Sequence, residues 1–327
     1  MSNKSYIKRY FLILFILFAL SIAYVCNFTK NYPAPITNRI SFDAKLKFIR
    51  DKINPKDIDT IIVGSSIGMN NVLGSVLEKN SKVVKHAINL SVYEATALEV
   101  EQLLELRGAF PNLKRIIYSA QYSDFPHPWR YKDYHPDILR EYITHKLSYY
   151  RSIKLLFKAC NNLVFCYKRA KNWKIKYQQK DKFTSLIFDD SASVPLYIFR
   201  QDKVGGRWYL PHPGIMSQKS FDAVGRIAKN AQNEGIKFYL AHQPYRPELY
   251  KKHKSVRDAV AYFDNKISKI LTKYPNSYLI KLQNLPLNNT QYADRTHLNI
   301  KGATIVTKEI SKFIDSKESK WNLQELK

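Results

Sequence analysis

The stretch that decides the fold is Asp59-Thr-Ile-Ile-Val-Gly64-Ser65-Ser66-Ile67-Gly68. Its β-branched run, 60–63, predicts a strand that is buried on both faces of a parallel sheet. Gly64 and two serines then end the strand and place a small hydroxyl at the carboxyl edge of the sheet, where open α/β sheets bind ligands. Serine is also a favoured helix N-cap, so a plain strand-to-helix cap remains the alternative from this stretch alone.

Strands and helices alternate along most of the chain. Further strands are predicted at 83–89, 115–119, 236–241 and 277–282, and helices at 42–53, 72–77, 95–106, 221–233, 255–273 and 301–314. This alternation predicts an α/β fold with a doubly wound parallel sheet. The predicted organisation is a cytoplasmic N-terminus and transmembrane anchor (1–30), a linker with a membrane-proximal helix (31–57), an α/β domain (58–318) and a C-terminal tail (319–327).

The charge balance and the N-terminus predict that the protein is anchored in a membrane. The chain has 53 Lys and Arg against 27 Asp and Glu, a net charge of +26, which predicts an anionic neighbourhood. No charge lies between Arg9 and Lys30, and a bilayer-spanning helix needs roughly 17–25 apolar residues. Lys4, Lys8 and Arg9 predict that the N-terminus lies inside. An uncleaved anchor is favoured over a cleaved signal peptide, because the end of the apolar run lacks a small-x-small site. The basic surface would then lie outside the cytoplasm, which argues for the bilayer and against nucleic acid as a partner.

A basic, aromatic helical insert is predicted at about 125–215. Within 140–182 there are twelve Lys and Arg but only two Asp and Glu. Such a helix either lies on an anionic membrane surface or packs on the domain with a solvated basic face. An insert of this length commonly covers the mouth of a site. Within it, Arg207 and Trp208 are candidates for contact with a sugar, and Cys160 and Cys166 are predicted to be free thiols.

A second motif, Asp294-Arg-Thr-His297, precedes the last predicted helix. The spacing of Asp294 and His297 lets the carboxylate accept the imidazole Nδ1–H, which fixes the tautomer and leaves Nε2 as a base. Alone, this pair would be read as a surface contact. Together with the serines at the end of the first strand, it completes the chain order Ser…Asp…His, which supplies nucleophile, orienting group and base.

These motifs resemble the SGNH (GDSL-like) hydrolase superfamily. Gly64-Ser65-Ser66 matches its first block, with Ser66 at the nucleophile position and Ser65 where the family name has Asp. Asp294-Arg-Thr-His297 matches its last block, and the resemblance covers about 58–315 apart from the insert. The resemblance implies a three-layer α/β sandwich and a catalytic triad of Ser66, Asp294 and His297.

The middle blocks suggest further contacts to an oxyanion or substrate. Glu94 stands where the family usually has a glycine, and Gln121 stands in place of an asparagine. His242 follows a strand and is a candidate for the pocket lining, although a structural histidine is the favoured interpretation. His127, His135 and His212 lack metal-ligand spacing, so no metal is assigned, and the mechanism requires no cofactor.

The anchor and the Gly-Ser-Ser block together resemble one branch of the superfamily. This branch includes the D-alanyl transfer protein of teichoic-acid synthesis and the alginate-type O-acetylation proteins. The resemblance implies a single-pass protein of the bacterial cytoplasmic membrane with its domain on the periplasmic or extracellular side. It also implies acyl transfer to, or ester cleavage on, a cell-envelope glycan or acylated envelope molecule, beside a multipass membrane-bound O-acyltransferase. The alternatives are a stand-alone envelope esterase or lipase, and a non-catalytic anchored binding protein.

Overall fold

A computed structural model describes most of the chain. The described residues are 3–33, 36–37, 39–131, 134–148, 150–152, 154–155, 162, 165, 168–169, 172–173, 177–199 and 213–319. The expectations for Cys160, Cys166, Arg207 and Trp208 lie outside these residues, as does much of the predicted basic helix.

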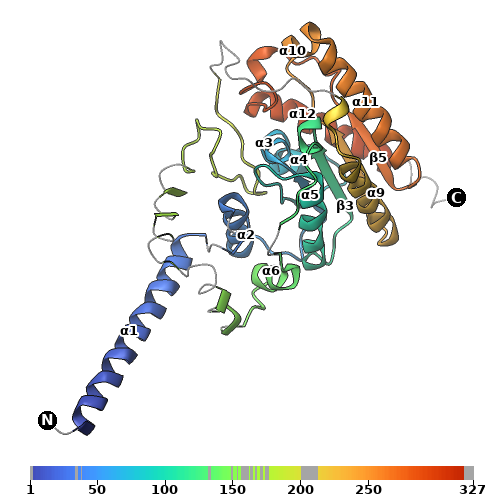
Figure 1. Cartoon of the computed structure of the whole chain (residues 1–327). Coiled ribbons are helices and arrows are strands. Elements are labelled where there is room, and N and C mark those ends of the chain that lie inside the picture. Colours follow the sequence, from blue (N-terminus) through green and yellow to red (C-terminus); the bar gives the residue numbers. More distant parts are fainter. Residues whose placement is uncertain are drawn as a thin grey trace.

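Five parallel strands form the centre of the domain (Figure 1). They are β1 (Thr60–Gly64), β2 (Ala87–Asn89), β3 (Arg115–Ala120), β4 (Lys237–His242) and β5 (Ser277–Lys281), in the order β2-β1-β3-β4-β5. This is one of the two common orders of doubly wound sheets, and its topological switch point lies between β1 and β3. The predicted α/β class and the parallel sheet are confirmed.

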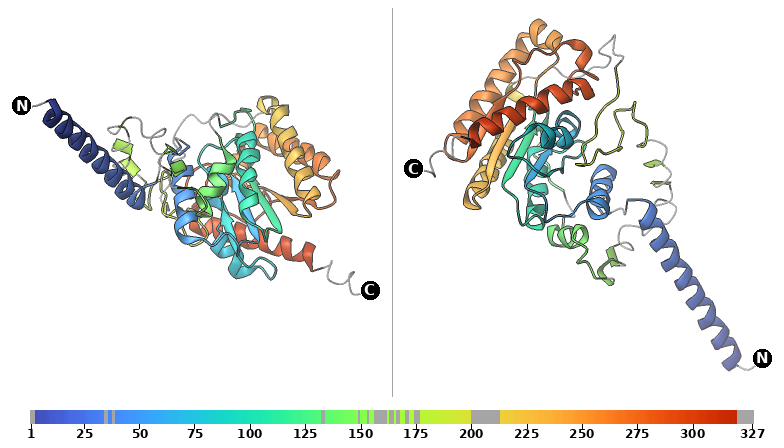
Figure 2. Two further views of the ribbon diagram at one scale, coloured as in Figure 1. Left: turned by 90° about the horizontal axis from the view of Figure 1, so that it is seen from below. Right: turned by 180° about the vertical axis from the view of Figure 1, so that it is seen from behind.

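Helices cover both faces of this sheet, as the views in Figure 2 show. The helices of the domain are α2 (Ile40–Lys52), α3 (Ser66–Asn71), α4 (Gly74–Asn80), α5 (Ala97–Leu103), α6 (Pro136–Ile143), α9 (Gln218–Asn233), α10 (Pro247–Lys252), α11 (Lys254–Leu271) and α12 (Ile300–Glu318). Ile61 and Val63 join a core with α5, α9 and α11, whereas Ile62 joins a second core with α4 and α12. Alternate strand residues thus face opposite cores, which explains the continuous apolar run of β1.

Two local predictions are wrong. The expected helix 72–77 begins only at Gly74, as α4, because Val72 is extended and separates it from α3. The expected strand 83–89 pairs only from Ala87 onward. The backbone N–H groups of Val83 and Val84 donate to the Ser81 hydroxyl, so side-chain hydrogen bonds replace the sheet ladder there.

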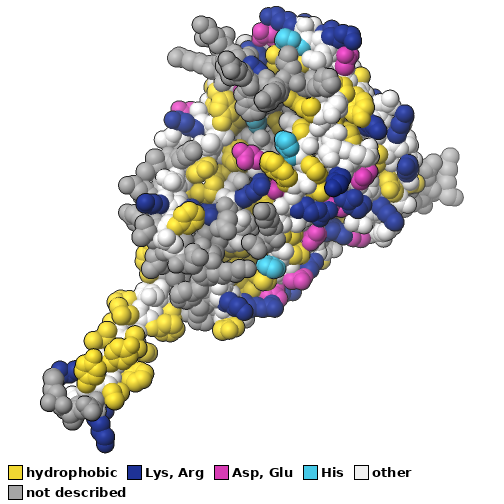
Figure 3. Space-filling model, viewed as in Figure 1, with side chains coloured by type: hydrophobic (Ala, Val, Ile, Leu, Met, Phe, Trp, Pro, Cys, Tyr) yellow, Lys and Arg dark blue, Asp and Glu magenta, His cyan; other side chains and the backbone are white. Residues whose placement is uncertain are grey.

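A single long helix, α1 (Asn3–Asn31), projects away from the domain (Figure 1). Its segment Lys4–Tyr24 has a mean hydropathy of 1.9 and is long and apolar enough to cross a membrane. The apolar side chains of this segment are exposed, and Figure 3 shows them covering the projecting helix. The expectation of one apolar N-terminal helix is therefore confirmed.

Candidate active site

The turn from β1 into α3 positions the candidate nucleophile. Gly64 leaves no room for a side chain, since a Cβ there would lie 2.3 Å from the carbonyl oxygen of Ser119. Ser65 is the N-cap of α3, and its hydroxyl accepts a hydrogen bond from the Ile67 N–H at 3.2 Å. Ser66 is the first residue of the helix. The two expectations for this stretch thus fall on neighbouring serines: Ser65 caps the helix, and Ser66 holds its hydroxyl at the sheet edge.

The Asp-x-x-His motif folds as a tight loop before α12. Tyr292 and Leu298 form an isolated antiparallel bridge, and the Ala293 N–H donates to the carbonyl of His297 at 2.8 Å. The loop is closed further by Oδ1 of Asp294, which accepts the His297 backbone N–H at 2.7 Å. The carboxylate and the imidazole therefore face each other across a fixed turn.

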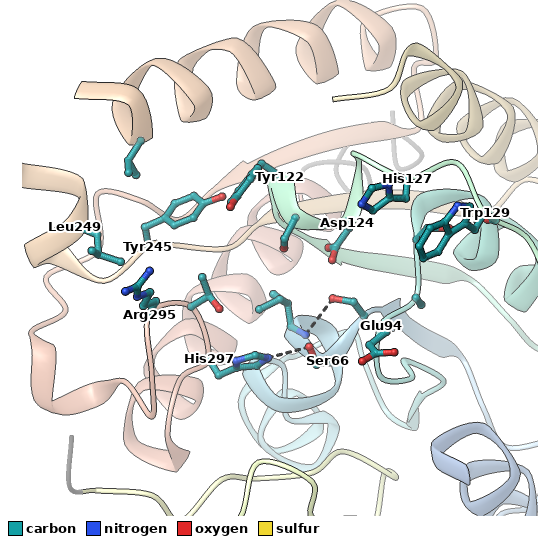
Figure 4. Close-up of a pocket in the computed structure, with 17 residues that line it drawn as sticks. Ser66, Glu94, Tyr122, Asp124, His127, Trp129, Tyr245, Leu249, Arg295 and His297 are labelled. Atoms are coloured by element: carbon teal, nitrogen blue, oxygen red, sulfur yellow. Dashed lines mark hydrogen bonds between the residues drawn. The ribbon is translucent and has the colours of Figure 1, made fainter. Parts of the chain in front are cut away.

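The structure brings the two motifs together, although 231 positions separate Ser66 from His297. His297 Nδ1 lies 2.7 Å from Asp294 Oδ2, and His297 Nε2 lies 2.8 Å from Ser66 Oγ (Figure 4). With Nδ1–H donating to the carboxylate, Nε2 is the acceptor for the Ser66 hydroxyl. This is the arrangement of nucleophile, general base and orienting acid that acyl transfer uses.

The electrostatics of the loop keep Asp294 ionised. Burial favours its neutral form, but His297 and the backbone N–H groups of Thr296 and His297 outweigh burial. The pKa of Asp294 is therefore held below its usual value. An ionised carboxylate at this position can fix the tautomer of His297 and stabilise the imidazolium that forms when the ring takes a proton.

Asn71, which sequence reasoning missed, ties the two motifs to each other. Its Oδ1 accepts the Leu298 N–H at 2.8 Å, and its Nδ2 donates to the carbonyl of Thr296 at 3.2 Å. The side chain is fully buried at the end of α3. Only the proximity of Asn71 to Ser66 in the sequence could have marked it, because the loop that it holds lies far away in the chain.

A cavity of about 490 Å³ opens over the Ser66–His297 pair (Figure 4). Its other lining residues are Ser65, Ile67, Glu94, Ala95, Thr96, Tyr122, Ser123, Asp124, His127, Trp129, Tyr245, Leu249, Val256, Arg295 and Thr296. Glu94 is exposed there and has φ 60°, a left-handed conformation that favours glycine. The structure thus places Glu94, the expected oxyanion or substrate contact, in the lining of the cavity.

Neither Gln121 nor His242 lines the cavity, which corrects their assignment as contacts to an oxyanion or substrate; for His242, the favoured interpretation of a structural histidine is the one that the structure shows. Gln121 Nε2 donates to the carbonyl of Pro244 at 3.1 Å, because its side chain reaches across to the segment after β4. His242 is buried, with Nδ1 2.7 Å from Asp264 Oδ1 and its ring 4.3 Å from that of Phe263. His242 is therefore a packed structural histidine.

After β3, the carboxyl group that lines the cavity is that of Asp124, which lies in the short helix η2 (Tyr122–Asp124). Its Oδ2 accepts the Gln121 backbone N–H at 3.0 Å. Burial raises the pKa of Asp124 to about 7, although the Gln121 N–H, the Ser65 hydroxyl and His297 act in the opposite direction. Sequence reasoning missed Asp124 because it searched only residues 119–122, directly after the strand, and chose Gln121.

Part of the insert packs beside the site. The Val194 N–H donates to the carbonyl of Met69 in α3 at 2.9 Å, and the Ile300 N–H donates to the carbonyl of Leu196 at 2.8 Å. The ring of Phe183 lies 6.1 Å from that of His297. Segment 177–199 therefore borders the catalytic candidates, in line with the expectation that the insert lies at the mouth of the site.

Comparison with known proteins assigns no family: no protein-family model matches the sequence, and no curated protein matches it significantly. Within the described ranges, the side chains of His, Cys, Asp and Glu form no group of three or more that could hold a metal ion. The function must therefore be argued from the geometry of the site itself.

Proposed function

We propose that this chain is a membrane-anchored, extracytoplasmic serine acyltransferase or esterase acting on O-acyl groups of a cell-envelope glycan or related surface molecule. The observation that carries the proposal is the hydrogen-bonded series Asp294–His297–Ser66, with contacts of 2.7 and 2.8 Å, at the floor of an open cavity. A chance surface pair of Asp and His would not end on a serine hydroxyl at the switch point of a parallel sheet.

In the first half of the proposed reaction, His297 Nε2 takes the proton of the Ser66 hydroxyl as Oγ attacks the acyl carbonyl carbon. The tetrahedral intermediate collapses when the bond to the leaving group breaks, and the imidazolium gives its proton to that group. In the second half, His297 deprotonates an acceptor hydroxyl or water, which attacks the acyl–Ser66 ester. The returning proton restores the Ser66 hydroxyl, and Asp294 stabilises the imidazolium in both halves.

Backbone N–H groups are the proposed donors to the oxyanion. Gln121 cannot serve, since its amide is bonded to carbonyls outside the cavity. Asn89 cannot serve either, because its Nδ2 donates to the carbonyls of Gly68 and Val72 at 3.0 Å. The backbone N–H of Ser66 remains as one donor, and that of Glu94, at the position of the family's glycine, is the second candidate. Removal of one such donor typically lowers kcat by roughly 10²–10³.

The proposed location outside the cytoplasm rests on α1, and the proposed substrate class rests on the resemblance to the SGNH superfamily. An apolar N-terminal helix preceded by positive residues supports a domain held outside the cytoplasm. The surface has a large excess of Lys and Arg, which suits an anionic membrane or envelope (Figure 3). A multipass membrane-bound O-acyltransferase is the proposed partner that supplies the acyl group.

The test is acylation of Ser66 in the full chain, reconstituted in lipid nanodiscs and mixed with p-nitrophenyl acetate. We expect an acetyl group on the peptide that contains Ser66, detected by mass spectrometry after an acid quench, and no such group in Ser66→Ala. Thermal unfolding followed by circular dichroism checks that this variant is folded. Equal p-nitrophenolate release by both proteins would refute the proposal.

A further inference from the structure

A tryptophan on the rim of the cavity has no role in the proposed chemistry. Trp129 is 62% exposed, and its indole stacks on the His127 ring, with 4.7 Å between ring centroids and 13° between ring planes. Both residues line the cavity, and Figure 4 shows them with Glu94 on one side of Ser66. A large aromatic side chain left exposed at the mouth of a pocket is typical of a contact with a ligand.

The loop that carries Trp129 is fixed to α5. The Thr96 hydroxyl donates to the carbonyl of Trp129 at 2.8 Å, and the Tyr131 N–H donates to Oε1 of Gln102 at 2.7 Å. Arg130 forms an ion pair with Glu101 at 2.6 Å. The exposure of the indole is therefore a fixed feature of the rim, and a ligand that stacks on it need not order the loop first.

Glu94 belongs to the same rim. It stands two residues before Thr96, so the hydrogen bond from Thr96 to Trp129 ties the two segments together. Its backbone has a left-handed conformation, which is uncommon and strained for residues other than glycine. Within the part of the chain that the structure describes, no hydrogen bond or ion pair holds its exposed carboxylate. Glu94 is thus a strained residue that offers free acceptor oxygens to the cavity.

We propose, as an extension that rests on the proposed acyl-transfer function, that Trp129, His127 and Glu94 form a subsite for a pyranose ring without acidic groups. Such a ring presents a face of C–H groups to the indole and hydroxyl groups to the carboxylate. The subsite would direct an acceptor hydroxyl toward Ser66 and His297. Arg295, Tyr245 and Leu249 lie on the other side of Ser66 (Figure 4) and leave that side for the acyl donor.

The carboxyl groups beside this subsite determine whether it prefers neutral or acidic sugars. The exposed Glu94 and the buried Asp124 are carboxyl groups that line the cavity on the Trp129 side of Ser66. A uronic acid bound there would bring its carboxylate close to Glu94, and like charges repel. The subsite therefore favours neutral sugars, despite the strong positive charge of the chain as a whole.

The test uses the full chain in nanodiscs with p-nitrophenyl acetate as donor, and cellopentaose or pentagalacturonic acid as acceptor probes. Acetylated oligosaccharide is measured by mass spectrometry. We expect transfer to cellopentaose in preference to the acidic probe. Trp129→Ala should raise KM for cellopentaose about tenfold or more. The KM of Trp129→Phe should lie between that of Trp129→Ala and that of the native chain. Glu94→Gln should narrow the preference between the two probes. The matched control is Tyr150→Ala, which removes a 73% exposed aromatic side chain that does not line the cavity. It should change neither the KM for cellopentaose nor the preference between the two probes.

Binding of cellopentaose to Ser66→Ala, followed by saturation-transfer NMR, separates the subsite from the chemistry. Binding that is lost in the double variant with Trp129→Ala would support the subsite even if no acetyl transfer is seen, in which case only the acyl-transfer function fails. Absence of binding to Ser66→Ala would overturn the subsite, as would equal cellopentaose KM values for Trp129→Ala and the native chain.

Discussion

Two pairs of Asp and His lie at the carboxyl edge of the same sheet, and they differ in what the second ring nitrogen meets. In each pair, Nδ1 of the histidine lies 2.7 Å from a carboxylate oxygen, of Asp294 for His297 and of Asp264 for His242. His297 Nε2 reaches the Ser66 hydroxyl in the cavity. His242 Nε2 is buried and has no hydrogen-bond partner among the described residues.

The comparison shows that an oriented imidazole is not by itself a catalytic base. The imidazole of His242 packs against Phe263 and Tyr245, and its side chain is 3% exposed, whereas that of His297 is 13% exposed. A general base needs both a proton to take and room for the reacting group. Of the two pairs, Asp294–His297 satisfies both conditions and Asp264–His242 does not, because the loop 294–297 is held over the N-terminus of α3 rather than against α11.

The largest expected contrast comes from one substitution made in each pair. His297→Gln should lower the rate of Ser66-dependent ester cleavage by roughly 10³-fold or more, since the amide cannot take the serine proton. His242→Gln should leave this rate within about threefold of the native value and lower the free energy of unfolding by about 1–3 kcal/mol, because it disturbs a buried hydrogen bond. Initial rates with p-nitrophenyl acetate and urea unfolding measure the two effects. Equal losses of rate in both variants would contradict the distinction between the pairs.

Substitution of the two aspartates should also lower kcat in one pair and not in the other, but the difference should be smaller than for the histidines. Asp294→Asn removes the charge that stabilises the imidazolium and favours the wrong tautomer of His297, so we expect a loss of roughly 10²–10⁴ in kcat. Asp264→Asn, the matched control, should leave kcat within a few-fold of the native value. A pH–rate profile adds a second readout, because loss of the carboxylate removes the charge that stabilises the imidazolium, so the acid limb of kcat should move. If the two variants retained similar kcat values, Asp294 would have no special role.

A third substitution breaks the link between α3 and the loop 294–297. Asn71→Ala removes the side chain that bonds the backbone of Thr296 and Leu298, and a small displacement of His297 from Ser66 is enough to slow the reaction. We expect a loss of about 10- to 100-fold in kcat with little change in KM. Asn80→Ala is the control, because it removes an exposed asparagine whose side chain bonds only the carbonyl of Val76 in its own helix. Native kcat in Asn71→Ala would show that the bridge is structural only.

The sequence predicted the parts of this site that depend on local pattern. The apolar run of β1 and the chain order of Ser66, Asp294 and His297 were enough to predict a parallel sheet and the three candidate residues. Gln121 was assigned to the cavity because its position after β3 was clear, but the direction of its side chain depends on the segment after β4, which is 122 positions away. The partners of Asn71 are equally remote in the sequence. The sequence therefore predicts which edge of the sheet carries the site, whereas long-range hydrogen bonds decide which side chains face it.

The smallest expected effect concerns Asp124, which shares the cavity with His297 but belongs to neither pair. Its pKa is about 7 in the folded chain and near its ordinary value of 3.8 in the unfolded chain. Between these values the folded state holds more protons, so the stability that Asp124 contributes is fully present below about pH 4 and is lost as the pH rises through 7. Asp124→Asn keeps an acceptor for the Gln121 N–H without a charge. We expect this variant to gain on the order of 1–3 kcal/mol in unfolding free energy relative to the native chain between pH 4 and pH 8.

The same substitution should move the acid limb of kcat/KM. The negative charge of Asp124 attracts the imidazolium, so its removal should shift the limb to lower pH. Asp264→Asn, which removes a carboxylate from the other pair, should leave the limb in place. Urea unfolding and pH–rate profiles from pH 4 to 9 give both readouts. A stability difference that does not change with pH would show that folding does not raise the pKa of Asp124. An unmoved acid limb would show that Asp124 does not act on His297, and the contrast between the two pairs would then rest only on access to the cavity and on Ser66.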